Sequence, residues 1–341
     1  MIRSLDNKLK ASFMKTIVLL FIITSLCCCR QAKPIGSIES LDPDFDLIVN
    51  KNAKVEIIAE DLDWSEGPLW IDSLKMLLFS DVPANTVYKW TQEKGKEVYL
   101  TPSGYTDTIK RGGETGSNGL LLSPTGKLVL CQHGNRQIAE MLPDISHPAP
   151  QFRTLADTFQ GKKFNSPNDA VFKKNGDLYF TDPPYGLERN MQDSLKEIPF
   201  QGVYLVKPSG EVKLLLDSIT RPNGIALTPD EKTLIVANSD QNRLRWYAYD
   251  IMGDSLIRGR VFYDATAVAG SQPGSADGLK IDKNGNIFAT GPGGIWVFNR
   301  KGKVLGKIKI ADVPTSNCAL TPDQRTLFVT ADMYVLRIKL R

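Results

Sequence analysis

A polar residue followed at once by a short, mostly apolar run recurs six times along this chain. Each of these polar side chains carries an oxygen atom of the kind that can bind a metal ion. The six residues are Glu66, Asn118, Asn168, Asn223, Asp277 and Asn317. Subtracting successive residue numbers gives steps of 52, 50, 55, 54 and 40 residues. A period of that length indicates a repeat built from several strands.

Within each repeat, the apolar run leads into a turn and then into a second strand-like segment. In the third repeat, the turn Lys174–Asp177 is followed by Leu178–Phe180, and its Asn and Gly residues favour a tight reversal. No stretch shows the sustained periodicity of about 3.6 residues that a long amphipathic helix needs. The sequence therefore predicts an all-β protein.

Six sheets of about four strands each, arranged around an axis, explain a sixfold period better than a β-sandwich does. We therefore predict a six-bladed β-propeller over residues 47–341. The early strand Val55–Ile58 is expected to complete the sheet of the last segment, Val335–Lys339, and so to close the ring. Because the first strands of all blades start on one side, the six polar residues should gather at one mouth of the central channel.

The first thirty residues have the pattern of an export signal. A basic stretch ends at Lys15, the apolar core Ile17–Ile23 is too short to span a bilayer, and cysteines follow it. The pattern resembles a bacterial lipoprotein signal over residues 1–29, with Cys29 as the lipidated residue and Cys27 or Cys28 as alternatives. An ordinary cleaved signal is the competing interpretation. Residues 30–46 are polar, and we expect them to form a tether. The predicted location is the periplasm or the outer membrane, and membrane contact is expected only through the lipid anchor.

The charge balance argues against a nucleic-acid partner. The formal net charge is +4, but the residues before Cys29 contribute +3 of it, from four basic side chains and one acidic one, which leaves +1 for the rest. No basic footprint remains for nucleic acid, and neither a zinc-finger spacing nor a P-loop is present in the sequence. We expect a monomer with buried, unpaired Cys131 and Cys318.

Four of the repeated polar residues form a plausible ligand set for a cation. Glu66 and Asp277 would supply two negative charges, and Asn168 and Asn223 two neutral carbonyl oxygens. Oxygen ligands without His or Cys select a hard cation such as Ca²⁺, with Mg²⁺, Mn²⁺ or Zn²⁺ as alternatives. A single Asn-Gly more often holds a turn. Six oxygen-bearing side chains at the same position of successive repeats favour metal binding, and so a central metal-binding channel.

Motifs around these positions resemble one known family, that of senescence marker protein, gluconolactonase and luciferin-regenerating enzyme. The resemblance covers the chain from about residue 55 to its end, and two motifs resemble the bacterial gluconolactonase branch in particular. The motifs are Ser65–Trp70, Ser166–Asp169, Arg221–Gly224 and Ala276–Gly278, and, for the bacterial branch, Cys131–Arg136 and Phe180–Gly186. The resemblance implies a six-bladed propeller that holds a divalent cation, commonly calcium, and hydrolyses small-molecule lactones or, in some members, phosphotriesters. It also implies the same four ligands.

The sequence departs from the family at one substrate position. Animal members have an Arg two residues before the third-blade Asn, where this chain has Ser166. Arg136 and Arg111 are the candidate replacements. We further predict that Asn118, Asp182 and Tyr185 contact substrate; for Asp182, which precedes two prolines, the alternative is that it pins a turn, whereas Tyr185 could stack on a sugar ring.

The predicted chemistry is the opening of a sugar lactone such as gluconolactone, in which the cation polarises the carbonyl group and water attacks. Asp277, Asp169 and His133 are the candidate bases. For His133 the competing interpretation is an ordinary hydrogen-bonded loop residue. Two further functions stay open: a non-catalytic propeller that binds carbohydrate or protein around a structural calcium ion, and an esterase or phosphotriesterase that uses the same site.

Overall fold

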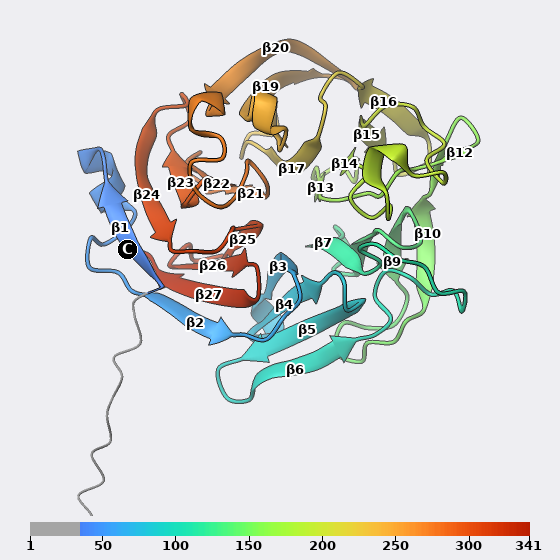
Figure 1. Cartoon of the computed structure of the whole chain (residues 1–341), viewed down its shortest axis with the longest axis horizontal. Coiled ribbons are helices and arrows are strands. Elements are labelled where there is room, and N and C mark those ends of the chain that lie inside the picture. Colours follow the sequence, from blue (N-terminus) through green and yellow to red (C-terminus); the bar gives the residue numbers. More distant parts are fainter. Residues whose placement is uncertain (1–34) are drawn as a thin grey trace, which may run out of the picture. The chain divides into compact units, whose positions relative to one another are not determined.

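The computed structural model describes residues 35–341, so the predicted signal peptide, Cys29 and the start of the predicted tether lie outside the described part. Six sheets follow one another around a central axis, as Figure 1 shows. The first three are β3 (Ser65–Ile71), β4 (Met76–Asp81), β5 (Thr86–Thr91) and β6 (Gly95–Leu100); β7 (Ser117–Leu122), β8 (Leu128–Gln132), β9 (Gln137–Met141) and β10 (Phe152–Ala156); and β13 (Ala170–Phe172), β14 (Leu178–Asp182), β15 (Gly202–Val206) and β16 (Val212–Leu216).

The other three sheets continue the ring. They are β17 (Pro222–Leu227), β18 (Thr233–Asn238), β19 (Arg245–Met252) and β20 (Ser255–Asp264); β21 (Leu279–Ile281), β22 (Ile287–Gly291), β23 (Gly294–Phe298), β24 (Val304–Ile310) and β1 (Gly36–Ser40); and β25 (Asn317–Leu320), β26 (Thr326–Ala331), β27 (Tyr334–Lys339) and β2 (Val55–Ala59). The predicted six-bladed β-propeller is therefore confirmed.

A small hairpin and short helical turns complete the described structure. The hairpin joins β11 (Thr158–Phe159) to β12 (Lys162–Lys163). The helical elements between residues 35 and 341 are all 3₁₀ turns: η1 (Pro43–Leu47), η2 (Asp72–Leu74), η3 (Asn190–Gln192), η4 (Gln241–Arg243) and η5 (Thr266–Val268). None of the helices in this part of the chain is long and apolar enough to cross a membrane.

The ring closes where the two ends of the domain meet in one sheet. Strand β2 pairs antiparallel with β27, with Val55 opposite Ile338 and Ile57 opposite Leu336. The early strand thus completes the last blade, as the sequence predicts. Closure of this kind leaves few free strand edges, which are the usual route to aggregation of β-proteins.

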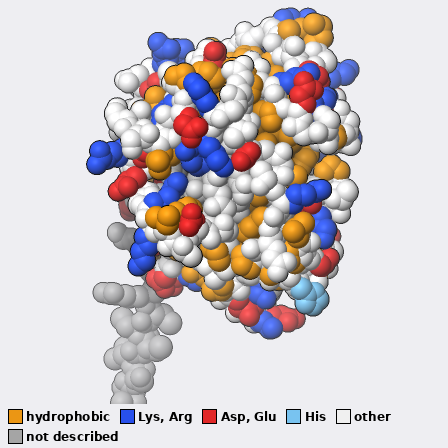
Figure 2. All heavy atoms as spheres, turned by 90° about the vertical axis from the view of Figure 1, so that its right-hand side faces the viewer, with side chains coloured by type: hydrophobic (Ala, Val, Ile, Leu, Met, Phe, Trp, Pro, Cys, Tyr) orange, Lys and Arg blue, Asp and Glu red, His pale blue; other side chains and the backbone are white. Residues whose placement is uncertain are grey.

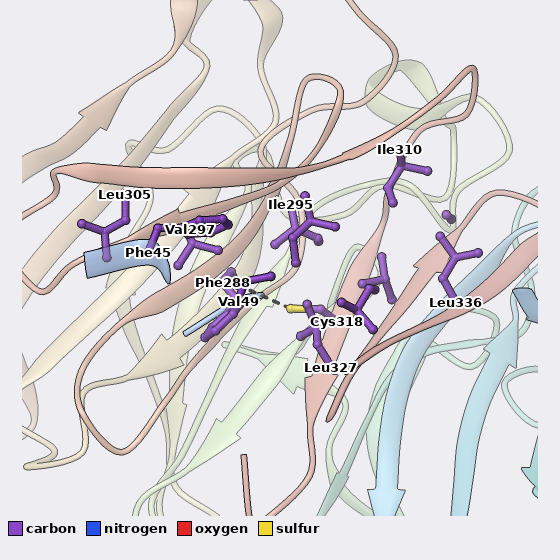
Figure 3. Packing of buried hydrophobic residues seen from close by; sticks show 14 residues of the cluster. Phe45, Val49, Phe288, Ile295, Val297, Leu305, Ile310, Cys318, Leu327 and Leu336 are labelled. Atoms are coloured by element: carbon purple, nitrogen blue, oxygen red, sulfur yellow. Dashed lines mark hydrogen bonds between the residues drawn. The ribbon is translucent and has the colours of Figure 1, made fainter. Parts of the chain in front are cut away.

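The predicted tether needs a correction, because its second half belongs to the domain. Strand β1 adds to the outer edge of β24, with Gly36 opposite Ile310, and a Cβ atom at Gly36 would lie 2.2 Å from the Lys309 carbonyl oxygen. Phe45 is fully buried in the core of this blade, beside Leu305 and Val297 in Figure 3. Backbone pairing and the buried Phe45 side chain therefore attach residues 36–45 to the fifth blade, although the composition of this segment is that of a linker.

The core lies between neighbouring sheets, where large side chains interlock. Between the fourth and fifth blades, Trp246 is fully buried and its ring centroid lies 5.3 Å from that of Phe298. Within residues 35–341, Cys131 and Cys318 are buried and form no disulfide bond. On the face shown in Figure 2, acidic, basic and apolar side chains are interspersed. The fold thus leaves the centre of the ring as the place where polar groups converge.

Candidate active site

A cavity of about 310 Å³ lies at the centre of the ring, where the innermost strands begin. All four predicted ligands line it, together with the predicted substrate residues Asn118 and Tyr185. Its lining residues are Trp64, Glu66, Glu114, Asn118, Asn168, Tyr185, Arg221, Asn223, Ser239, Gln241, Ser275 and Asp277. Residues that stand more than two hundred positions apart in the sequence therefore meet at one site, as the repeat predicts.

Glycine after the polar residue is what lets neighbouring blades come so close. A Cβ atom on Gly67, which follows Glu66 and has a φ of +51°, would lie 2.1 Å from the Asn118 carbonyl oxygen. A Cβ atom on Gly224 would lie 2.2 Å from the Asp277 carbonyl oxygen in the same way. Any larger residue at these positions would push the next blade outward, so the polar-Gly pairs keep the ring tight around its centre.

Two oxygen atoms at the cavity lack a partner within the described residues. Asn118 Oδ1 and Asp277 Oδ1 are both buried and accept no hydrogen bond. Buried polar atoms normally have a hydrogen-bonding partner, so these two free oxygen atoms are suited to binding a cation. No three His, Cys, Asp or Glu side chains between residues 35 and 341 cluster as a metal site on their own. The candidate set instead combines two carboxylates with two carboxamides.

The raised pKa values of Glu66 and Asp277 also fit a cation-binding site. Burial, helped by the nearby Asp169 and Glu114 charges, raises the pKa of Glu66 to about 8. The N–H of Gly67, which donates to Glu66 Oε2 at 3.0 Å, opposes this shift. Burial also raises the pKa of Asp277 well above its ordinary value, with the charge of Glu66 as the next cause. A divalent cation between them would remove this repulsion.

Tyr185 lies at the cavity as predicted, whereas Asp182 does not. Burial raises the pKa of Tyr185 to about 12, the Asp277 charge adds to the shift, and hydrogen bonds to Ser239 and Arg221 oppose it. Asp182 is fully buried away from the cavity, where it accepts the backbone N–H groups of Asn165 and Ser166, each at 2.8 Å. Burial raises its pKa to about 7. It pins the turn before Asn168, which is the alternative that the sequence left open.

Neither candidate for the missing arginine reaches the cavity. Arg136 donates to the Phe164 carbonyl at 2.6 Å and to Glu197 at 3.3 Å. Arg111 donates to the Gly186 carbonyl at 2.5 Å and lines a separate, neighbouring cavity. The arginine at the site is Arg221, which the sequence reasoning missed. Its signal was present: it stands two residues before Asn223, the same spacing one blade further on.

The three candidate bases lie in different surroundings. Asp277 lines the cavity. Asp169 is buried outside the lining, with Oδ2 3.7 Å from Lys280 Nζ and 3.5 Å from Asn317 Nδ2. His133 is also buried outside the lining, and its Nδ1 lies 3.5 Å from Glu114 Oε2. Of the three, Asp277 is therefore the one that the structure brings to the cavity.

Comparison with known proteins places this chain in a family. Residues 64–332 match the family described as SMP-30/Gluconolactonase/LRE-like region. The chain belongs to this family. It is 39% identical over 311 residues to a gluconolactonase from Zymomonas mobilis, which covers 89% of this chain and 86% of that protein. The family that the sequence motifs resembled is thereby confirmed.

Solved structures with the same fold include a gluconolactonase and a regucalcin. A gluconolactonase from Xanthomonas campestris superposes with a TM-score of 0.76 at 26% identity, over 89% of this chain and 95% of that one. Regucalcin from Agrobacterium tumefaciens, described as a calcium-binding protein, superposes with a TM-score of 0.63 at 16% identity, over 83% of this chain and 93% of that one. The latter likeness shows the fold alone.

Proposed function

We propose that this protein is a divalent-cation-dependent hydrolase that opens sugar lactones of the gluconolactone class. The similarity to the gluconolactonase of Zymomonas mobilis, which spans nearly the whole of both chains, supports the reaction class. The single observation that carries the proposal is the meeting of Glu66, Asn168, Asn223 and Asp277 at one cavity, together with the unpartnered oxygen of Asp277. Such a set is suited to a cation that leaves room for substrate.

Calcium is the cation that the donor set favours. Glu66 and Asp277 would hold it with two charges, and Asn168 and Asn223 with two neutral oxygens; all-oxygen sites of this kind suit hard cations. When bound, the cation would act as a Lewis acid on the lactone carbonyl. Mg²⁺, Mn²⁺ and Zn²⁺ are the competitors that a test must include.

The other lining residues suit a small, polyhydroxylated ring. Arg221 supplies a charged donor, Gln241, Ser239 and Ser275 supply neutral hydrogen-bonding groups, and the ring of Tyr185 supplies a partly apolar wall. The volume of about 310 Å³ suits a compact ligand. The roles of these residues are to bind and orient the lactone, so that its carbonyl group faces the candidate cation site.

The predicted location is part of the same proposal. Export with lipidation at Cys29 would place the domain in the periplasm or on the outer membrane, as a monomer. Mass spectrometry of the N-terminal peptide of the protein from a bacterial host tests this: a diacylglyceryl cysteine at position 29 supports the anchor, and an unmodified cleaved end contradicts it.

The activity is tested by hydrolysis of glucono-1,5-lactone with the purified full chain, stripped of metal and then supplied separately with Ca²⁺, Mg²⁺, Mn²⁺ and Zn²⁺. We expect turnover that depends on added cation and is lost in Asp277→Ala. The matched control is Asp282→Asn, which changes an aspartate on the turn after β21, away from the cavity lining, and should keep full turnover. Simple esters and phosphotriesters form the second panel. Turnover on these alone would replace the lactonase proposal with an esterase, and none on any substrate despite cation binding would favour a binding propeller.

A further inference from the structure

His133 carries a buried imidazole ring. It follows β8, its side chain has no exposed surface, and neither ring nitrogen makes a hydrogen bond within the described residues. Gly186 packs against the His133 side chain, where an added Cβ atom would lie 2.6 Å from His133 Cβ. Buried polar groups are rarely left unpaired, so a fully enclosed imidazole with two free nitrogens calls for an explanation.

The acidic side chain of Glu114, which lines the cavity, lies close to the His133 ring. Glu114 Oε2 lies 3.5 Å from His133 Nδ1, just beyond hydrogen-bonding distance, and its side chain is 36% exposed. A small rotation of the Glu114 side chain would therefore complete the bond. Three carboxylates line the cavity. Glu66 and Asp277 belong to the candidate ligand set, so Glu114 is the one that is free to exchange a proton with substrate or water.

The loop that carries Glu114 is fixed on both sides of His133. The His133 N–H donates to the Gly116 carbonyl at 3.1 Å, and the Gly134 N–H donates to the Thr115 carbonyl at 3.2 Å. A Cβ atom on Gly134 would lie 2.4 Å from that Thr115 carbonyl oxygen, so the two segments touch closely. Arg111, earlier in the same loop, donates a hydrogen bond to the Gly186 carbonyl. The backbone thus holds Glu114 beside His133 and against the cavity.

We propose that Glu114 is the proton-accepting catalytic residue of the hydrolysis and that His133 is its positioning residue, which acts from behind the cavity wall. This inference rests on the proposed lactonase function and adds a residue that the repeat motifs do not contain. His133 cannot contact substrate because it is enclosed, so its influence must pass through Glu114.

The step balances as an ordinary ester hydrolysis. A water oxygen forms a bond to the lactone carbonyl carbon, and the Glu114 carboxylate takes the proton that the water loses. The bond between the carbonyl carbon and the ring oxygen then breaks, and the ring oxygen receives that proton from Glu114. The product is the open hydroxy acid, which releases its carboxyl proton to solvent, and Glu114 is again a carboxylate.

The test compares variants of the full chain on glucono-1,5-lactone with calcium present. We expect Glu114→Gln to lower kcat by about 100-fold, the range of a lost general base, with KM unchanged. Calcium affinity, measured by calorimetry, should stay at the wild-type value. Added formate should restore turnover to Glu114→Ala, because a free carboxylate can replace the missing one. The matched control is Glu188→Gln, an exposed glutamate beside the neighbouring cavity, which should keep wild-type kcat.

The role of His133 is tested by a double-mutant cycle. His133→Gln should lower kcat in the wild-type background and have no further effect in Glu114→Gln. A Glu114→Gln variant that keeps kcat within about threefold of wild type overturns the inference, and so does one that loses calcium binding together with activity. Absence of turnover in the wild-type protein on every lactone would remove the proposed function itself, and the inference with it.

Discussion

The paired carboxylates predict that the metal-free protein loses stability as the pH rises. Glu66 has its pKa raised by burial from an ordinary 4.5 to about 8, so the folded state binds this proton more tightly than the unfolded state does. The free energy of unfolding of the metal-free protein should therefore be highest below pH 4.5 as far as this group is concerned, and fall between pH 4.5 and about 8. Asp277 acts in the same direction.

The size of the effect follows from the pKa change. Raising the pKa of Glu66 from 4.5 to about 8 corresponds to as much as about 5 kcal/mol of unfolding free energy. Calcium at about 100 times its dissociation constant should add about 3 kcal/mol back, because it binds only the folded ring. Urea denaturation of metal-free and calcium-saturated protein across this pH range measures both.

The Glu66→Gln variant isolates the contribution of this one carboxyl, because it keeps the shape and cannot ionise. Its metal-free unfolding free energy should fall less steeply between pH 4.5 and about 8 than that of the wild type. Equal pH slopes for the two proteins would refute the argument that Glu66 is held in a buried, uncompensated site.

Two further predictions concern substrate recognition and the domain boundary. Arg221→Ala should raise KM for gluconolactone about tenfold or more, since it removes a charged donor at the cavity, whereas the exposed Arg243→Ala should leave KM unchanged; an unchanged KM in Arg221→Ala would contradict a substrate role. Phe45→Ala should lower the free energy of unfolding by about 3–5 kcal/mol, whereas Leu47→Ala, at a side chain that is 73% exposed, should change it by less than about 0.5 kcal/mol; equal effects would return residues 35–46 to a tether.

The sequence alone was enough for the ring and for its polar centre. The period of the polar residues predicts the number of blades, and the Gly that follows four of the six, as at Gly67 and Gly224, is needed for neighbouring blades to meet. Glu66 and Asp277 were predictable as residues of the central cavity because position in a repeat determines position in a propeller. The closing strand β2 was predictable because the last repeat is one strand short.

The loops were not predictable, because contacts distant in sequence decide their course. The segment that carries Glu114 is anchored by Asn85, whose Oδ1 accepts the backbone N–H groups of residues 103–105. The repeat pattern of the sequence does not predict a contact of this kind. Contacts distant in sequence also explain why Arg136, which bonds to backbone carbonyls, was a wrong candidate for the cavity. They explain as well why β1 was not predicted, because its polar segment becomes a strand only by pairing with β24.

The central claim is that one divalent cation, held at the cavity by Glu66, Asn168, Asn223 and Asp277, supports lactone hydrolysis. The most direct test titrates calcium into the metal-stripped full chain while calorimetric binding and the rate of glucono-1,5-lactone hydrolysis are followed under the same conditions. The account predicts one bound cation per chain, a rate that rises in proportion to its occupancy, and loss of both in Asp277→Ala. Full turnover in the stripped protein, or calcium binding that Asp277→Ala leaves intact, would contradict it.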